Sequence, residues 1–191
     1  MRGDVYEYLL SKIAQSGRNG QFRTPRHIIR MMVEMMDPAA DEMICDPACG
    51  TSGFLVASGE YLREKKKEDI FYNKANRDHY MNHMFYGYDM DRTMLRIGAM
   101  NMMTHGIDNP CIEYRDSLSD QNSDKNKYTL VLANPPFKGS LDAFEFCRIL
   151  ASELEECGFH TISLPLGDGG DGTARIVAHY LHAHPIKTKT V

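Results

Sequence analysis

The chain has 191 residues, a formal net charge of −4 and 42% hydrophobic residues. This length suits one domain with a substantial core and is too short for two. The mildly negative net charge does not indicate a nucleic-acid-binding surface, although a local basic patch can occur in an acidic protein. No apolar run approaches the ~20 residues that span a bilayer, and the polar N-terminus lacks the apolar core of a signal peptide. We therefore expect a soluble, cytoplasmic protein.

The cysteines indicate neither a disulfide framework nor a metal site. There are five, an odd number, and no two stand in a CxxC pair. Cys45 and Cys49 are four residues apart, but no second cysteine or histidine pair accompanies them as in a structural zinc site. We expect reduced thiols and no bound metal.

Two helices are predicted before the first strand. Apolar residues at helical spacing predict the first over residues 4–14. Thr24 followed by Pro25 predicts the N-cap and the start of the second. This helix continues through residues 26–36 and ends before Asp37.

Strands and helices alternate in the middle of the chain. The apolar run at residues 42–45 predicts a buried strand, after which small residues form a turn and a helix begins near Gly53. The charged run at residues 63–69 fits a solvated helix end. A polar loop is expected to lead to a second strand within residues 83–91.

The same alternation continues towards the C-terminus. Residues 92–106 predict a helix, residues 111–118 a third strand, and residues 128–136 a fourth strand that is apolar enough to be buried on both faces. Strands that alternate with helices predict a parallel α/β sheet, in which ligands bind beyond the carboxyl ends of the strands. The methionines of the helix that we expect to pack in the core are Met94, Met100, Met102 and Met103.

The most specific string is DPACGTSGF, residues 46–54, at the end of the first strand. Gly50 and Gly53 allow a sharp turn and a close approach of the backbone to a ligand. The amides at the start of the following helix favour a negatively charged group. A purely structural tight turn is the alternative for a glycine pair alone.

Acidic residues follow the next two strands. Asp89 stands where a carboxylate commonly accepts hydrogen bonds from ribose hydroxyls, and Asp116 stands where it could accept one from an adenine amino group. Asp91 is a second candidate for the role of Asp89 and also fits a helix N-cap. Taken singly, each acid also fits a cap or turn; in order at successive strand ends, they predict a nucleoside pocket.

The fourth strand ends in NPPF, residues 134–137. Two prolines stiffen this turn, so that the side-chain oxygen of Asn134 and the carbonyl of Pro135 form fixed acceptors for an exocyclic amino group. Phe137 offers a flat face for stacking of a base. The alternative is a proline-rich turn with a core phenylalanine.

These strings form an ordered set. GQFRTP, DPACGTSGF, YGYDMD, RDSL and ANPPF closely resemble the S-adenosylmethionine-dependent DNA adenine-N6 methyltransferases, most of all the modification subunit of type I restriction–modification systems. The resemblance spans about Gly3 to Asp142. It implies a Rossmann-like, doubly wound parallel sheet that is truncated in this chain.

The resemblance also implies roles for individual residues. GQFRTP would help to enclose the methionine part of the cofactor, the glycine turn would form the main cofactor loop, and the two acids would bind ribose and adenine. NPPF would be the catalytic motif. The cofactor-binding residues implied are Phe22, Thr24, Pro25, Asp46, Ala48, Gly50, Thr51, Gly53, Asp89 and Asp116, and the catalytic ones are Asn134, Pro135, Pro136 and Phe137.

The implied reaction is methyl transfer to an adenine flipped out of DNA. Catalysis would rest on positioning and electrostatics, without a metal. By resemblance, the partners are DNA and the specificity and restriction subunits of a type I system.

The sequence after NPPF resembles a second family. From about Phe137, the strings PFKGSLDAFEF, HTISLPL and GDGGDGT resemble the N-terminus of a glycerate kinase. We expect a methyltransferase core at residues 1–142 and a kinase-like tail at residues 143–191, with a possible fusion between residues 137 and 143. A helix over residues 143–156 and a strand over residues 159–164 could complete the sheet through a right-handed crossover. An ordinary methyltransferase with a divergent tail is the alternative.

Other functions remain open from sequence. One is a catalytically incomplete fragment that binds S-adenosylmethionine without turnover. Another keeps the chemistry and changes the substrate to RNA or a protein glutamine, although Phe137 and GQFRTP favour DNA. A glycerate-kinase-like fragment is the most distant alternative.

Overall fold

The computed structural model describes residues 24–117, 119, 124, 127–132, 145, 147–149 and 151–152. Several predictions from sequence lie outside these residues: the helix at 4–14, Phe22, the NPPF motif and the strand at 159–164. The chain divides into two units, Met1–Pro135 and Pro136–Val191. In the second unit the described residues are helical. The first unit carries the sheet.

The described strands form one parallel sheet with the order β3-β2-β1-β4. The parallel α/β arrangement predicted from sequence is therefore confirmed. Strand order reverses at β1, because β2 lies on one side of it and β4 on the other. The carboxyl ends of β1 and β4 consequently form the switch point at which such sheets bind ligands. The strands are β1 (Ile44–Asp46), β2 (Phe85–Asp89), β3 (Cys111–Tyr114) and β4 (Leu130–Val131).

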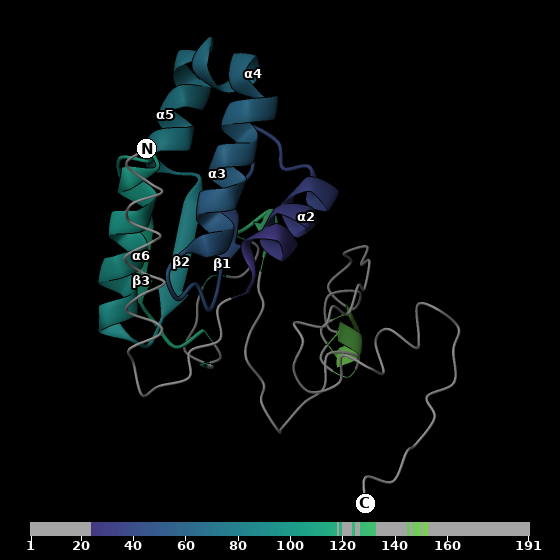
Figure 1. The fold of residues 1–191 in the computed structure, drawn as a ribbon, viewed down its shortest axis with the longest axis vertical. Helices are drawn as coiled ribbons and strands as arrows, with labels where there is room; N and C mark the ends of the chain where they lie inside the picture. Colours follow the sequence, from purple (N-terminus) through teal and green to yellow (C-terminus); the bar gives the residue numbers. More distant parts are fainter. Residues whose placement is uncertain are drawn as a thin grey trace, which may run out of the picture. The chain divides into compact units, whose positions relative to one another are not determined.

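Five helices are described in the first unit, and α3 lies across β1 and β2 (Figure 1). The predicted helices at 26–36 and 92–106, and the one that begins near Gly53, are confirmed as α2, α6 and α3. The helices are α2 (Arg26–Met36), α3 (Gly53–Lys65), α4 (Lys67–Phe71), α5 (Lys74–Asn82) and α6 (Arg92–Thr104). No helix in this described part is both long and apolar enough to cross a membrane.

The polar loop predicted between α3 and β2 is wrong, since this segment forms α4 and α5. The side chain of Asn73 caps α5 by accepting hydrogen bonds from the backbone N–H groups of Ala75 and Asn76, at 2.9 and 3.4 Å. Ile70 and Tyr80 are fully buried. A good cap and two buried anchors stabilise helices that are otherwise polar.

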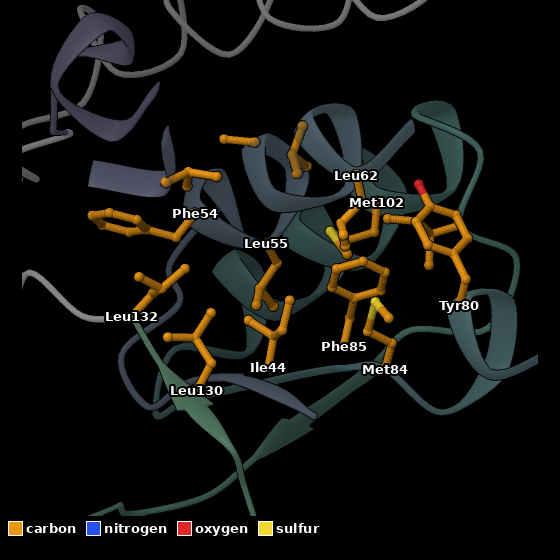
Figure 2. Close-up of a cluster of buried hydrophobic side chains, with 14 of the residues drawn as sticks. Ile44, Phe54, Leu55, Leu62, Tyr80, Met84, Phe85, Met102, Leu130 and Leu132 are labelled. Carbon is orange, nitrogen blue, oxygen red and sulfur yellow. The ribbon is translucent and has the colours of Figure 1, made fainter. Parts of the chain in front are cut away.

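The hydrophobic core lies between α3 and one face of the sheet. Figure 2 shows Leu55 and Leu62 of α3 facing Ile44 and Phe85 of the strands. All four are buried, and burying a side chain of this size contributes about 1.5–3 kcal/mol. At Gly59, an added Cβ would lie 2.8 Å from Ile107 Cδ1, so α3 also packs closely against the segment after α6. Packing on this face thus fixes α3 and the loop that precedes it.

The other face of the sheet carries an aromatic and charged cluster. The Tyr128 hydroxyl donates to Asp124 at 2.6 Å, and the hydroxyl of Tyr88 on β2 lies within hydrogen-bond distance of both Tyr128 and Asp124. The guanidinium of Arg115 lies 4.1 Å from the centre of the Tyr88 ring. Val131 is 55% exposed, so the prediction that the fourth strand is buried on both faces is wrong.

Two further predictions from sequence need correction. The N-cap of α2 is Pro25, which has extended backbone and makes no side-chain cap hydrogen bond, so Thr24 is not the N-cap. Of the four methionines expected in the core, Met102 is fully buried, whereas Met100 and Met103 are exposed. These two lie on the outer side of α6, because a helix buries only one stripe of residues.

Candidate functional site

The glycine turn predicted from sequence is a loop between β1 and α3, at the switch point of the sheet. Its backbone is tied to the end of β2: Cys49 N donates to Tyr88 O at 2.9 Å, and Gly50 N donates to the Asp89 carboxylate at 2.9 Å. Gly50 and Ser52 both have left-handed backbone, with φ of 50° and 61°. An added Cβ at Gly50 would meet nothing within 4 Å, so the space beside the loop is open there.

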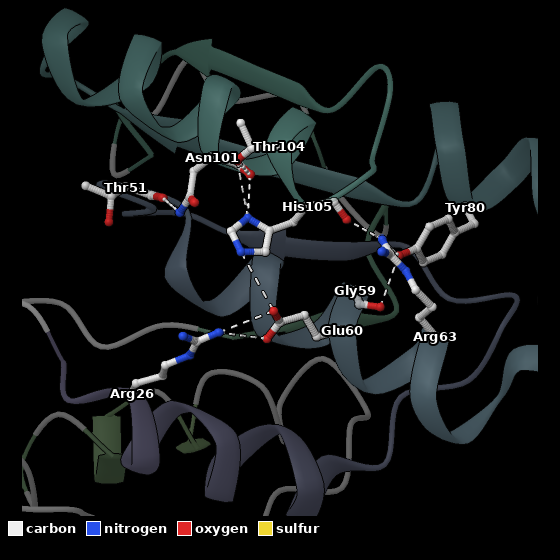
Figure 3. Close-up of polar contacts among 9 residues, drawn as sticks. All are labelled: Arg26, Thr51, Gly59, Glu60, Arg63, Tyr80, Asn101, Thr104 and His105. Atoms are coloured by element: carbon white, nitrogen blue, oxygen red, sulfur yellow. Dashed lines mark hydrogen bonds and ion pairs between the residues drawn. The ribbon is translucent and has the colours of Figure 1, made fainter. Parts of the chain in front are cut away.

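Helix α6 holds the loop from a second direction. Asn101 Nδ2 donates to Thr51 O at 2.8 Å (Figure 3). One turn earlier, an added Cβ at Gly98 would lie only 2.5 Å from Ser52 Oγ and 3.1 Å from Gly50 O. The close approach of α6 to the loop therefore requires glycine at position 98.

Residues from β2 and from the segment after β3 complete this support. An added Cβ at Gly87 would lie 2.9 Å from Cys49 Sγ, and Ser117 Oγ donates to Pro47 O at 2.6 Å. Sequence reasoning missed these residues together with Gly98 and Asn101. A glycine inside a helix or a strand signals close backbone approach, so Gly87 and Gly98 could have been found; Asn101 and Ser117 carry no such signal.

Asp89 is the acid that binds the loop. It ends β2, as predicted, and one carboxylate oxygen accepts from Gly50 N while the other accepts from Asp91 N at 2.8 Å. A carboxylate has about four acceptor positions, so Asp89 can still accept hydrogen bonds from hydroxyl groups. Asp91 is the N-cap of α6, and it accepts from Thr93 N and Met94 N at 2.8 and 3.2 Å. Asp89 therefore binds the loop, and Asp91 caps the helix.

Asp46 is a buried carboxyl at the end of β1, with 2% of its surface exposed. Its side chain accepts from Ala48 N at 3.1 Å. The pKa of Asp46 is raised to about 7, chiefly by burial and to a lesser extent by nearby Asp89, while the hydrogen bond from Ala48 N opposes the rise. The group is thus poised to exchange its proton near neutral pH and is most easily ionised when a positive charge lies close.

Of the other predicted site residues, the structure describes Gly53, Thr24, Pro25 and Asp116 outside the loop and β2. Gly53 begins α3, and an added Cβ there would lie 3.2 Å from Ile29 Cδ1 of α2. Thr24 and Pro25 immediately precede α2. Asp116 is exposed and lies two residues beyond the end of β3, beside the Ser117 that binds the loop.

The site therefore combines carboxylates, open space beside the backbone of Gly50 and the N-terminus of α3, at the edge of the sheet where the strands have their carboxyl ends. These groups suit a ligand that carries hydroxyls and both signs of charge. Among the described residues, no three His, Cys, Asp or Glu side chains gather where they could hold a metal ion.

Comparison with protein families gives two matches. The family described as N-6 DNA Methylase matches residues 1–147. The Glycerate kinase family matches residues 130–191, so that the two matches overlap over residues 130–147. The first match includes every predicted site residue.

Individual relatives agree with the first match. The chain is 33% identical over 141 residues to the type I restriction enzyme EcoEI methylase subunit of Escherichia coli, covering 72% of this chain and 28% of the relative. It is 33% identical over 138 residues to the HindI methylase subunit of Haemophilus influenzae, covering 71% and 28%. The chain thus spans under a third of the length of these relatives.

Solved structures show the same likeness. A type I restriction–modification system structure is 32% identical with a TM-score of 0.60, covering 71% of this chain and 27% of that one. The type I restriction enzyme EcoKI M protein is 25% identical with a TM-score of 0.56, covering 63% and 26%. The match over residues 1–147, together with the sheet order and the glycine loop at its switch point, places this chain in the N-6 DNA methylase family.

Proposed function

We propose that this chain is the catalytic part of an adenine-N6 DNA methyltransferase that uses S-adenosylmethionine within a type I restriction–modification system. The observation that carries the proposal is the glycine loop at the switch point, held by Asp89 through Gly50 N. β4 is the neighbour of β1 in the sheet and ends three residues before Asn134, the first residue of the NPPF motif. The strand that precedes the glycine loop and the strand that leads in sequence to NPPF are neighbours in the sheet, which supports the proposal.

The groups at the loop fit this cofactor. S-adenosylmethionine carries a sulfonium, an ammonium group, a carboxylate and a ribose diol. Asp89 has acceptor capacity left for the diol, the buried Asp46 favours a nearby positive charge, and the open backbone at Gly50 permits close approach. The residues proposed to hold the cofactor are Phe22, Thr24, Pro25, Asp46, Ala48, Gly50, Thr51, Gly53, Asp89 and Asp116.

The NPPF motif would hold the target base. The bound cofactor supplies an electrophilic methyl group. Asn134 Oδ1 and the carbonyl of Pro135 accept hydrogen bonds from the adenine amino group, Pro136 stiffens the turn, and Phe137 stacks on the flipped ring. The two acceptors help N6 to move towards tetrahedral geometry, because they stabilise the hydrogens of a nitrogen that becomes positive.

The proposed setting is a cytoplasmic complex with DNA, a specificity subunit and a restriction subunit. The proposed division is a methyltransferase core at residues 1–142 and a tail at residues 143–191. The names of the relatives support the setting, since they are methylase subunits of type I enzymes.

Calorimetric titration with S-adenosylmethionine tests the cofactor site, with Asp89→Asn as the variant and Asp91→Asn as its matched control. The two positions are two residues apart and undergo the same chemical change. Asp89→Asn leaves a loop N–H without its charged acceptor, so we expect about tenfold weaker binding, whereas Asp91→Asn preserves a good helix cap. Absence of binding by the folded wild-type chain contradicts the proposal.

A second measurement separates an enzyme from an incomplete fragment that only binds the cofactor. Methyl transfer to unmethylated DNA is followed with and without a type I specificity subunit, and Asn134→Ala serves as the inactive control. Transfer that Asn134→Ala abolishes supports the enzyme; cofactor binding without transfer under either condition supports the fragment.

The match of residues 130–191 to the Glycerate kinase family supports one further candidate, a kinase-like fragment. Binding of ATP by this chain would favour it. We expect none, because the matched segment is far too short to supply the rest of a kinase domain.

A further inference from the structure

Glu60 of α3 joins two other helices through its carboxylate. Arg26 Nη2 of α2 lies 3.3 Å from each of its oxygens. His105, immediately after α6, places Nε2 3.7 Å from Glu60 Oε1. Figure 3 shows the glutamate between the guanidinium and the imidazole. One carboxylate thus contacts α2 and the end of α6 at the same time.

The contacts continue from His105 to the glycine loop. His105 Nδ1 donates to the backbone oxygen of Asn101 at 2.8 Å, and the imidazole is 9% exposed. Asn101 Nδ2 in turn donates to Thr51 O at 2.8 Å. A short series of polar contacts therefore runs from Glu60 to the loop that we propose for the cofactor.

The other end of the series reaches the start of α2. Arg26 is the first residue of this helix and directly follows Thr24 and Pro25. Ile29, one turn later, packs beside Gly53 at the start of α3. The start of α2 is therefore placed against α3 by an apolar contact and by the Arg26–Glu60 pair.

The surrounding groove does not suggest a ligand of its own. It has a volume of about 450 Å³ and lies between α2 and α3, where Arg30 and Glu34 face it alongside Arg26 and Glu60. Arg30 and Glu34 form an exposed ion pair at 4.0 Å. Because positive and negative groups alternate, the groove favours contacts between its own walls over capture of a charged molecule.

We infer that Glu60 is a positioning residue that holds the start of α2 in register with the glycine loop, so that Thr24, Pro25 and the loop enclose the same ligand. This inference rests on the proposed function, in which that ligand is S-adenosylmethionine and the start of α2 lies at its methionine part. Exposed ion pairs contribute little to overall stability. The effect of Glu60 is therefore expected in ligand affinity rather than in unfolding.

The test measures affinity for two ligands in Glu60→Ala and in Glu34→Ala, the matched control on the same groove. S-adenosylmethionine carries the amino-acid part, and 5′-methylthioadenosine lacks it. We expect Glu60→Ala to weaken binding of S-adenosylmethionine about three- to fivefold and to leave 5′-methylthioadenosine unchanged. Glu34→Ala should affect neither ligand. Glu60→Gln retains an acceptor for Arg26 and should restore most of the affinity.

A second readout keeps this inference separate from the proposed function. Hydrogen exchange of the Ile28 and Ile29 amides, which donate to Pro25 O in the first turn of α2, is measured in the ligand-free protein. We expect faster exchange in Glu60→Ala than in Glu34→Ala. Wild-type protein that binds no S-adenosylmethionine would overturn the proposed function, and equal exchange in the two variants would overturn the positioning role. Equal loss of affinity for both ligands would also overturn it.

Discussion

Two aspartates at the end of β2 show how strongly position determines the role of a carboxylate. Asp89 accepts from a loop amide, whereas Asp91, two residues later, accepts from the first amides of α6. Each bond places an anion near a positive helix end or an unpaired N–H group. The two side chains should therefore respond differently to the same substitution.

The helix cap gives the first prediction. Asp91→Ala should lower the free energy of unfolding by about 1 kcal/mol, because two amides of α6 lose their acceptor. Asp91→Asn should cost only a few tenths of that amount. Urea denaturation measures both variants, and affinity for S-adenosylmethionine should be unchanged in each. A larger loss of affinity than of stability in Asp91→Ala would transfer the ligand-binding role to Asp91.

Asp46 should make stability depend on pH. Its pKa is raised from an ordinary 3.8 to about 7, chiefly by burial. Between these values the folded chain keeps a proton that the unfolded chain releases, so the free energy of unfolding should fall as pH rises from about 4 to about 7. The integrated effect has an upper bound of about 4 kcal/mol.

The matched variant is Asp46→Asn, which keeps an acceptor for Ala48 N and cannot ionise. Urea denaturation between pH 4.5 and 7.5 should give a flatter profile for this variant than for the wild type, and greater stability at the upper end. Parallel profiles for the two proteins would show that Asp46 ionises as readily in the folded state as in the unfolded one.

Sequence reasoning predicted the position of Asp89 at a strand end but left its role open against Asp91. The difference depends on which backbone amide each carboxylate reaches. Gly50 N is 39 residues away from Asp89 along the chain and 2.9 Å away in space, and no local pattern encodes that distance. The cap of α6, by contrast, is local and could be named from sequence.

At the scale of elements, the packing of α6 against the glycine loop is the main determinant of loop geometry. Gly98 permits contact so close that a methyl group would overlap Ser52 Oγ. Alanine is intrinsically the better helix former by about 1 kcal/mol. Any loss of stability on substitution must therefore come from the loop.

Gly98→Ala should destabilise the protein by about 1–3 kcal/mol, as overpacking does, and should weaken cofactor binding. Ser52→Gly removes the hydroxyl that the new methyl group meets and relieves a left-handed φ of 61°. The double variant should therefore be more stable than Gly98→Ala alone. Chemical denaturation of the two single variants and the double variant measures this coupling, and strictly additive effects would show that the contact with Ser52 is not the cause.

The helices that were not predicted from sequence, α4 and α5, are stabilised mainly by tertiary contacts. The pattern over residues 67–82 is too polar and too short for a helix prediction, yet α4 and α5 form there because Ile70 and Tyr80 reach the core. The ring of Tyr80 packs edge-on against Phe71 and Phe85, with centroids 5.5 and 5.4 Å apart. Such contacts between distant segments do not register in a local pattern.

At the scale of the whole molecule, β4 lies at one edge of the described sheet. β3, β2 and β1 extend the sheet in one direction and β4 begins the other half. In a doubly wound sheet, a right-handed crossover after β4 places the next helix on the face opposite to α3. Val131 on that face is 55% exposed, and it is the kind of residue that such a helix would cover.

The last prediction is that residues 143–191 complete this sheet, with a helix at 143–156 and a strand at 159–164. If they do, the segment from β4 onward is stabilised by the same cooperative unit as the core, and a protease should find few sites that open locally. Limited proteolysis of the full chain should then give loss of intact protein in parallel with global unfolding, measured by urea denaturation under the same conditions. Rapid cleavage near Gly139 that leaves a stable product of residues 1–138 would mean that the sheet folds without the tail. The tail would then be a separate segment joined to a methyltransferase core.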